Sequence, residues 1–120
     1  RSARFLVVDD EASIRKLAST ILSAGGHIVD ATGDATDALA KLESTAYDAI
    51  LLDIRMPGMS GMELYDLITT AKPELTTRFI FITGDTWDTN VRDFLDQKKL
   101  TYITKPFERA TLIQKVSSLL

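Results

Sequence analysis

Short apolar runs alternate with longer segments of helical periodicity along the whole chain. The five runs lie at residues 5–8, 28–29, 49–52, 79–82 and 102–103. Three of them, at 5–8, 49–52 and 79–82, are almost continuously hydrophobic, which is typical of strands that are buried on both faces of a parallel sheet. The alternation predicts a parallel sheet with helices on both faces, joined by right-handed crossovers.

The segments between the runs read as amphipathic helices. In the first, apolar residues follow the i, i+3, i+4, i+7, i+8 spacing of one helix face, and Gly25 and Gly26 end it. The third opens with Ser60 and Glu63, which match the S-x-x-E capping box, and Pro73 follows its end. Further apolar stripes lie at 35–42, 87–95 and 112–120. We therefore expect one α/β domain over residues 1–120, a doubly wound (βα)5 five-stranded parallel sheet.

Composition excludes several classes of site. The chain has no cysteine and a single histidine, His27, so it cannot form disulfides, thiolate zinc sites or a histidine-based metal cluster. A formal net charge of −3 argues against non-specific binding to nucleic acids or acidic membranes. No apolar run approaches the roughly 20 residues that span a bilayer, and residues 1–13 lack the features of a signal peptide. We expect a cytoplasmic protein.

Polar residues stand where the predicted strands end, which is where ligands bind in this architecture. These residues are Asp9, Asp10 and Glu11 after the first run, Asp53 after the third, Thr83 after the fourth, and Lys105 with Pro106 after the fifth. Converging carboxylates repel one another unless a cation lies between them, and Mg²⁺ typically takes one or two carboxylates plus phosphate oxygens. The set suits phosphoryl transfer to a carboxylate, with formation of an acyl phosphate.

These pieces make the chain resemble the receiver domain of two-component response regulators, the CheY-like superfamily with its flavodoxin-like fold, over essentially its whole length. The resemblance is carried by four motifs in order, each at a strand end: VVDDE at 7–11, LLDIRMPGMSG at 51–61, ITG at 82–84 and KPF at 105–107. Any one of them alone is weak evidence. Four at the family's usual separations make a specific signal.

The resemblance implies that Asp53 is the phosphoacceptor. It implies that Asp10 and Asp53 bind Mg²⁺ through their side chains, Arg55 through its backbone carbonyl, and Asp9 through a metal-bound water. Such a domain catalyses its own phosphorylation and dephosphorylation but is not a turnover enzyme in the usual sense.

The resemblance also assigns a switch. Thr83 and Lys105 would hold the phosphoryl oxygens, the bond before Pro106 is expected to be cis, and the ring of Tyr102 is expected to turn inward as Thr83 moves. The expected partners are a sensor histidine kinase or a phosphotransfer protein, and an output domain or partner at the face formed by the fourth helix, fifth strand and fifth helix. A homodimer could form on phosphorylation. Direct contact of this domain with nucleic acid or membrane is not expected.

Simpler structural interpretations exist for each residue. Asp9 and Asp10 could cap the first helix, Thr83 could cap the fourth, and Lys105 could be a solvated loop residue. All of these would have to hold at once, so we favour the functional interpretation. Two rival functions are a pseudo-receiver that is never phosphorylated and an aspartyl phosphotransferase of the haloacid-dehalogenase type. The second usually has an acid two residues after its nucleophile, where this chain has Arg55.

Lys98-Lys99 stand where the family often has Gly-Ala, so the fourth helix could end differently. We hypothesise that Arg55 pairs with Asp85 across the pocket mouth and slows attack by water on the acyl phosphate. The segments around Phe94 and Lys105 look similar to receivers of hybrid histidine kinases, although a free-standing receiver and an effector-linked regulator stay open.

Overall fold

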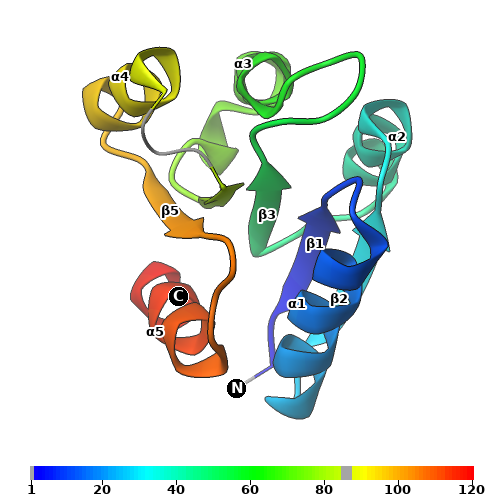
Figure 1. Cartoon of the computed structure of the whole chain (residues 1–120). Helices are drawn as coiled ribbons and strands as arrows, with labels where there is room; N and C mark the ends of the chain where they lie inside the picture. Colours follow the sequence, from blue (N-terminus) through cyan, green and yellow to red (C-terminus); the bar gives the residue numbers. More distant parts are fainter. Residues whose placement is uncertain (1, 85–87) are drawn as a thin grey trace.

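The computed structural model describes residues 2–84 and 88–120, which form one five-stranded parallel sheet (Figure 1). The strand order is β2-β1-β3-β4-β5. The strands are β1 (Arg4–Val8), β2 (Ile28–Thr32), β3 (Ala49–Asp53), β4 (Phe79–Thr83) and β5 (Thr101–Thr104). This topology confirms the predicted doubly wound (βα)5 fold.

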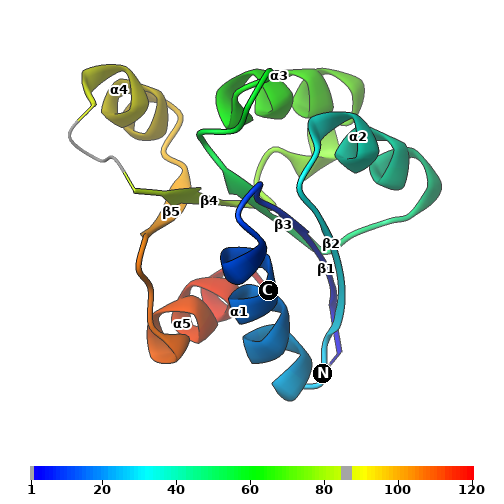
Figure 2. The same cartoon turned by 45° about the vertical axis from the view of Figure 1, so that its right-hand side comes forward.

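Helices cover both faces of this sheet. In the described ranges they are α1 (Ala12–Ala24), α2 (Ala35–Ser44), α3 (Gly61–Ala71), α4 (Thr89–Gln97) and α5 (Arg109–Leu119), with a short 3₁₀ turn η1 (Pro73–Leu75) after α3. Figure 2 shows α1 and α5 on one side of the sheet and α2, α3 and α4 on the other. No helix in the described part of the chain is long and apolar enough to cross a membrane.

The central strands explain why three apolar runs are nearly continuous. β1, β3 and β4 lie in the middle of the sheet and alternate their side chains between two cores. Phe5 and Val7 pack with α1 and α5, whereas Leu6 and Val8 pack with α2 and α3. The edge strands β2 and β5 have the shorter apolar runs, because each has a neighbouring strand on one side only.

The helix ends follow the expected chemistry in part. Ser60 and Glu63 form the predicted capping box at the start of α3. α4 ends in a left-handed residue although no glycine is present: Lys99 has φ 53°, and the Leu100 N–H donates to the Leu95 carbonyl at 2.9 Å. This is the Schellman arrangement, so the helix ends as one with glycine would, with a strained lysine instead. Trp87, which we assigned to the apolar stripe of the fourth helix, lies outside the described residues.

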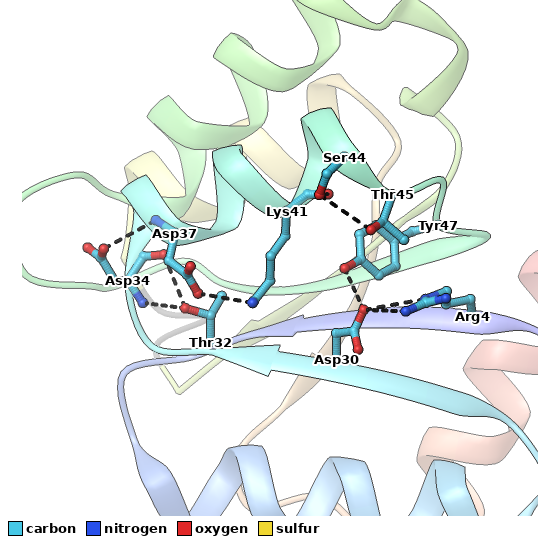
Figure 3. Close-up of polar contacts among 9 residues, drawn as sticks. All are labelled: Arg4, Asp30, Thr32, Asp34, Asp37, Lys41, Ser44, Thr45 and Tyr47. Carbon is cyan, nitrogen blue, oxygen red and sulfur yellow. Dashed lines mark hydrogen bonds and ion pairs between the residues drawn. The ribbon is translucent and has the colours of Figure 1, made fainter.

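A polar cluster ties the α2–β3 loop to the sheet (Figure 3). The Tyr47 hydroxyl donates to Asp30 Oδ2 at 2.7 Å, and Arg4 Nη2 donates to the same oxygen at 3.1 Å. Burial, together with the hydrogen bond to Asp30, raises the pKa of Tyr47 to about 12, while the Tyr47 bond lowers the pKa of Asp30. Arg4 begins β1, at the opposite end of that strand from the predicted site, so we read this cluster as structural.

Candidate functional site

The register of the sheet brings the predicted site residues together. β1 is adjacent to β3, and the helices that follow them, α1 and α3, lie on opposite faces of the sheet, so the topological switch point lies between β1 and β3. Val8 is opposite Leu52, which sets Asp9 beside Asp53. Thr83 is opposite Thr104 at the ends of β4 and β5, and the Lys105 N–H donates to the Thr83 carbonyl at 2.9 Å. One end of the sheet therefore gathers residues that are distant in sequence.

Three carboxylates converge at this point. One carboxylate oxygen from each of Asp9, Asp10 and Asp53 lies within 4.8 Å of those of the other two. Asp9 is fully buried and Asp53 is 3% exposed, whereas Asp10 faces solvent. Asp9 Oδ2 is buried and, among the described residues, accepts no well-formed hydrogen bond, although the Lys105 ammonium lies 3.2 Å away. Three converging carboxylates, two of them buried, fit a hard divalent cation such as Mg²⁺.

Lys105 lies among these acids. Its Nζ is 2.6 Å from Glu11 Oε1, 3.2 Å from Asp9 Oδ2 and 3.4 Å from Asp53 Oδ2. Burial by itself would lower the pKa of Lys105, but the hydrogen bond to Glu11 and the charges of Asp53 and Asp9 outweigh it and raise that pKa. The lysine is therefore a fixed cation within reach of the predicted acceptor.

The environment of Asp53 is unfavourable to a carboxylate in the absence of a metal. Burial, followed by the charge of Asp9, raises the pKa of Asp53 to about 7, against the opposing charge of Lys105. The Arg55 N–H donates to Asp53 Oδ1 at 3.2 Å and also opposes this rise. A cation between the carboxylates would remove the repulsion and favour the ionised form of Asp53, which is the form that acts as a nucleophile.

The simpler structural interpretations do not fit these contacts. The N-cap of α1 is Glu11, whose side chain makes no capping bond, and Asp9 Oδ1 accepts the N–H of Glu11 itself at 2.9 Å. The N-cap of α4 is Asp88, whereas Thr83 is the buried last residue of β4. The side chain of Lys105 is 16% exposed, so it is not a solvated loop residue.

Asp10, Asp53 and Lys105 border a cleft of about 260 Å³. Its lining consists of Asp10, Glu11, Asp53, Arg55, Gly84 and Lys105. The peptide bond before Pro106 is cis, as expected. Tyr102, the expected switch residue, is 38% exposed on β5. The cleft leaves the end of β3 accessible to a small molecule.

Some contacts were not predicted from the sequence. Glu11 was noted at a strand end but given no role, and it makes the shortest contact of Lys105 in this cluster. Arg55 pairs with Asp88, the N-cap of α4, and the predicted partner Asp85 lies outside the described residues. Gly61 is also essential to the geometry, because a Cβ there would lie 2.2 Å from the Asp53 carbonyl oxygen. The only sequence signal for Gly61 was its place in the motif after Asp53.

Comparisons with known proteins agree with this geometry. The family model "Response regulator receiver domain" matches residues 5–117. The transcriptional regulatory protein DltR of Streptococcus agalactiae is 35% identical over 94% of this chain and 50% of its own length. The CAI-1 autoinducer sensor kinase/phosphatase CqsS of Vibrio cholerae is 33% identical over 96% of this chain and 17% of its own. The chain thus spans half or less of the length of these curated relatives.

Solved structures give the same result. The chemotaxis protein CheY4 of Vibrio cholerae superposes with a TM-score of 0.89 at 28% identity, over the whole of both chains. The response regulator TrrA of Thermotoga maritima, solved in complex with Mg²⁺-BeF, has a TM-score of 0.84 at 35% identity, covering 98% of this chain and 99% of TrrA. These matches do not favour a haloacid-dehalogenase enzyme. The chain belongs to the response regulator receiver domains, the receiver modules of two-component signal transduction.

Proposed function

We propose that Asp53 accepts a phosphoryl group from a phosphohistidine donor, and that residues 1–120 form one such receiver. The observation that carries the proposal is the position of Asp53: it ends a buried strand, lies beside Asp9, has Lys105 Nζ 3.4 Å away, and opens on a cleft. A carboxylate oxygen of Asp53 attacks phosphorus, the phosphorus–nitrogen bond of the donor breaks, and the released imidazole takes a proton.

In the proposed site, Mg²⁺ would be held by the side chains of Asp10 and Asp53, by the backbone carbonyl of Arg55 and, through water, by Asp9. It would supply positive charge to the phosphoryl oxygens. The Mg²⁺-BeF in the structure of TrrA supports the choice of metal. Lys105 already carries its charge beside Asp53, and the hydroxyl of Thr83 would donate to a second phosphoryl oxygen. Positioning and charge stabilisation of this kind are the main requirements of phosphoryl transfer, so the domain would promote its own phosphorylation.

The output would be a population shift. A new dianion at Asp53 draws Thr83 toward it, and the exposed ring of Tyr102 on the neighbouring strand then turns into the space that Thr83 leaves. We propose that the changed surface of α4, β5 and α5 binds an output domain, a partner or a second copy.

The parent protein and its location are also proposals. The relatives include a transcriptional regulator and a sensor kinase/phosphatase, so they support an effector-linked regulator as well as the hybrid histidine kinase that the sequence favours. The donor would be a sensor histidine kinase or a phosphotransfer protein. We expect the domain to work in the cytoplasm, on the basis of its family.

The test is the mass of the intact protein after incubation with Mg²⁺ and acetyl phosphate. A gain of about 80 Da, roughly one phosphoryl group, is expected for the native protein and for Asp66→Asn, which alters an exposed carboxylate on α3. Asp53→Asn should gain nothing. Borohydride reduction followed by peptide mapping should then locate the acyl phosphate at position 53.

A different pattern would favour the pseudo-receiver. If the native protein stays unmodified under conditions in which a known receiver is labelled, the phosphoacceptor proposal is wrong. An adduct that persists in Asp53→Asn would assign the acceptor to another side chain.

A further inference from the structure

Arg15 makes a contact that none of the sequence motifs predicted. It lies in the first turns of α1, is half-buried, and its Nη1 donates to the backbone carbonyl of Asp9 at 2.7 Å. Side chains of a helix lean toward its N-terminus, which lets Arg15 reach back to the β1–α1 connection. The guanidinium therefore binds the backbone of Asp9, one of the three converging acids.

Space for this guanidinium is provided by Gly33, in the connection between β2 and α2. A Cβ at position 33 would lie 2.6 Å from Arg15 Nη1 and 3.3 Å from the Asp9 carbonyl oxygen. Gly33 is not among the residues with positive φ. Position 33 thus requires the absence of a side chain and not an unusual backbone conformation, because Arg15 fills the space that a Cβ would need.

The backbone of Asp9 is consequently held on both sides. Its N–H donates to the Thr32 carbonyl at 3.1 Å, and its carbonyl accepts from Arg15. Its carboxylate is fixed as well, because Oδ1 accepts the N–H of Glu11 at 2.9 Å, which leaves Oδ2 turned toward Lys105. Bonds within the protein therefore orient both the backbone and the carboxylate of Asp9.

We infer that Arg15 is a positioning residue for the metal site: it orients the Asp9-Asp10 corner through the Asp9 carbonyl, and Gly33 keeps the space in which it does so. The inference rests on the proposed binding of Mg²⁺ by Asp9, Asp10 and Asp53. Groups that orient metal ligands typically change metal affinity by about 10–100-fold when they are removed.

The direction of the change in Mg²⁺ affinity distinguishes a positioning role of Arg15 from a direct effect of its charge. Removing a cation near a metal site would, by Coulomb's law alone, strengthen binding of Mg²⁺. Positioning predicts the opposite. Arg15→Met keeps most of the apolar stem and loses the charge, whereas Gly33→Ala keeps the charge and pushes the mobile guanidinium away from the Asp9 carbonyl.

The experiment is calorimetric titration of the native protein and its variants with MgCl₂ in the absence of phosphodonor, together with the melting temperature of each metal-free form. Arg15→Met and Gly33→Ala should each weaken binding of Mg²⁺ by about tenfold or more. The double variant should be no weaker than the weaker single variant, because both changes remove the same bond. Arg15→Lys should recover part of the affinity.

Two control variants should bind Mg²⁺ as the native protein does. Lys16→Met changes an exposed lysine on the same helix, and Gly25→Ala places a Cβ that meets nothing closer than 3.4 Å.

Each outcome has one meaning. If the native protein itself does not bind Mg²⁺, the proposed metal site is wrong and the inference falls with it. If the native protein binds and Arg15→Met or Gly33→Ala binds equally well or more tightly, the metal site stands and the positioning role is overturned. Weakened affinity that merely follows a lower melting temperature of the metal-free form, in the controls as in the variants, would also overturn it, since that pattern reports general loss of structure.

Discussion

The guanidinium of Arg55 bonds to the carboxylate of Asp88 and so joins the loop after the proposed acceptor to the start of α4. Asp88 is also the N-cap of α4, where Oδ1 accepts the N–H groups of Asn90 and Val91. These bonds, led by the one from Val91, lower the pKa of Asp88. The acid therefore stays ionised as a partner for Arg55 over the whole neutral range.

We predict that the Arg55–Asp88 ion pair slows hydrolysis of the acyl phosphate on Asp53. Arg55 lines the cleft, and a side chain held at its rim restricts the approach of water to Asp53. Arg55→Ala keeps the backbone carbonyl and should speed dephosphorylation roughly two- to fivefold, the scale of an exposed ion pair. Asp88→Asn retains the cap and loses the charge, so it should have the same effect. Dephosphorylation rates of the phosphorylated variants give the comparison.

Salt provides the control for this prediction. The ion pair is exposed, with 59% of the Arg55 side chain in contact with solvent. The difference in dephosphorylation rate between the native protein and the variants should therefore shrink between about 0.1 and 1 M salt, because the screening length falls from roughly 10 to 3 Å. Unchanged rates in both variants at low salt would show that the bridge does not protect the acyl phosphate.

The second prediction concerns pH and Mg²⁺. The pKa of Asp53 is about 7 in the folded protein and 3.8 as its ordinary value, so the folded state binds the extra proton between these values. The free energy of unfolding of the metal-free protein should then fall as pH rises from about 4 to 7 and stay low above that. Asp53→Asn cannot ionise at this position and should lose much less stability over the same range.

Addition of Mg²⁺ should reverse this trend, because the metal binds the ionised carboxylates in competition with protons. The stabilisation by Mg²⁺ should be larger at pH 8 than at pH 5, as measured by urea unfolding with and without the metal. Equal stabilisation at both values of pH would contradict the proposed participation of Asp53 in the metal site.

Gly61 gives a third prediction, on stability. A Cβ at this position would lie 2.2 Å from the Asp53 carbonyl oxygen and 2.8 Å from Ile54 Cα, and backbone atoms cannot move aside without disturbing the site. Gly61→Ala should reduce the free energy of unfolding by about 1–3 kcal/mol or more. Gly84→Ala is the matched control, since no atom of residues 2–84 or 88–120 lies within 4 Å of a Cβ there. Urea unfolding that finds the two variants equally stable would refute the close packing of α3 on the end of β3.

The alternation of apolar runs was sufficient to predict the sheet because continuous hydrophobicity reports burial on both faces, and the three runs with this property are the central strands β1, β3 and β4. The acids and the lysine at the strand ends were predictable for a related reason. Parallel strands of a doubly wound sheet bring their carboxyl ends to one edge, so position in the chain determines position at the site.

Contacts between side chains of different loops could not be predicted in this way. Lys105 and Glu11 are 94 residues apart, and Arg55 and Asp88 are 33 apart. Which acid a lysine contacts at 2.6 Å rather than 3.4 Å depends on rotamers and loop paths, which periodicity does not encode. The space beside Gly33 is another example, because a missing side chain has a meaning only once Arg15 is seen to fill the space.

Lys99 gives the last prediction, which tests the end of α4. A left-handed conformation is unfavourable for a residue with a Cβ by about 1–2 kcal/mol, so glycine at this position removes that cost. Part of the stabilisation is lost because glycine also has greater conformational freedom in the unfolded chain. Lys99→Gly should therefore raise the free energy of unfolding by roughly 0.5–1 kcal/mol. Lys98→Gly should lower it, since Lys98 has a right-handed backbone and its Nζ lies about 6 Å from the rings of Tyr65 and Phe94. If urea unfolding shows both glycine variants to be destabilised, Lys99 does not hold the strained conformation in solution, and α4 ends differently.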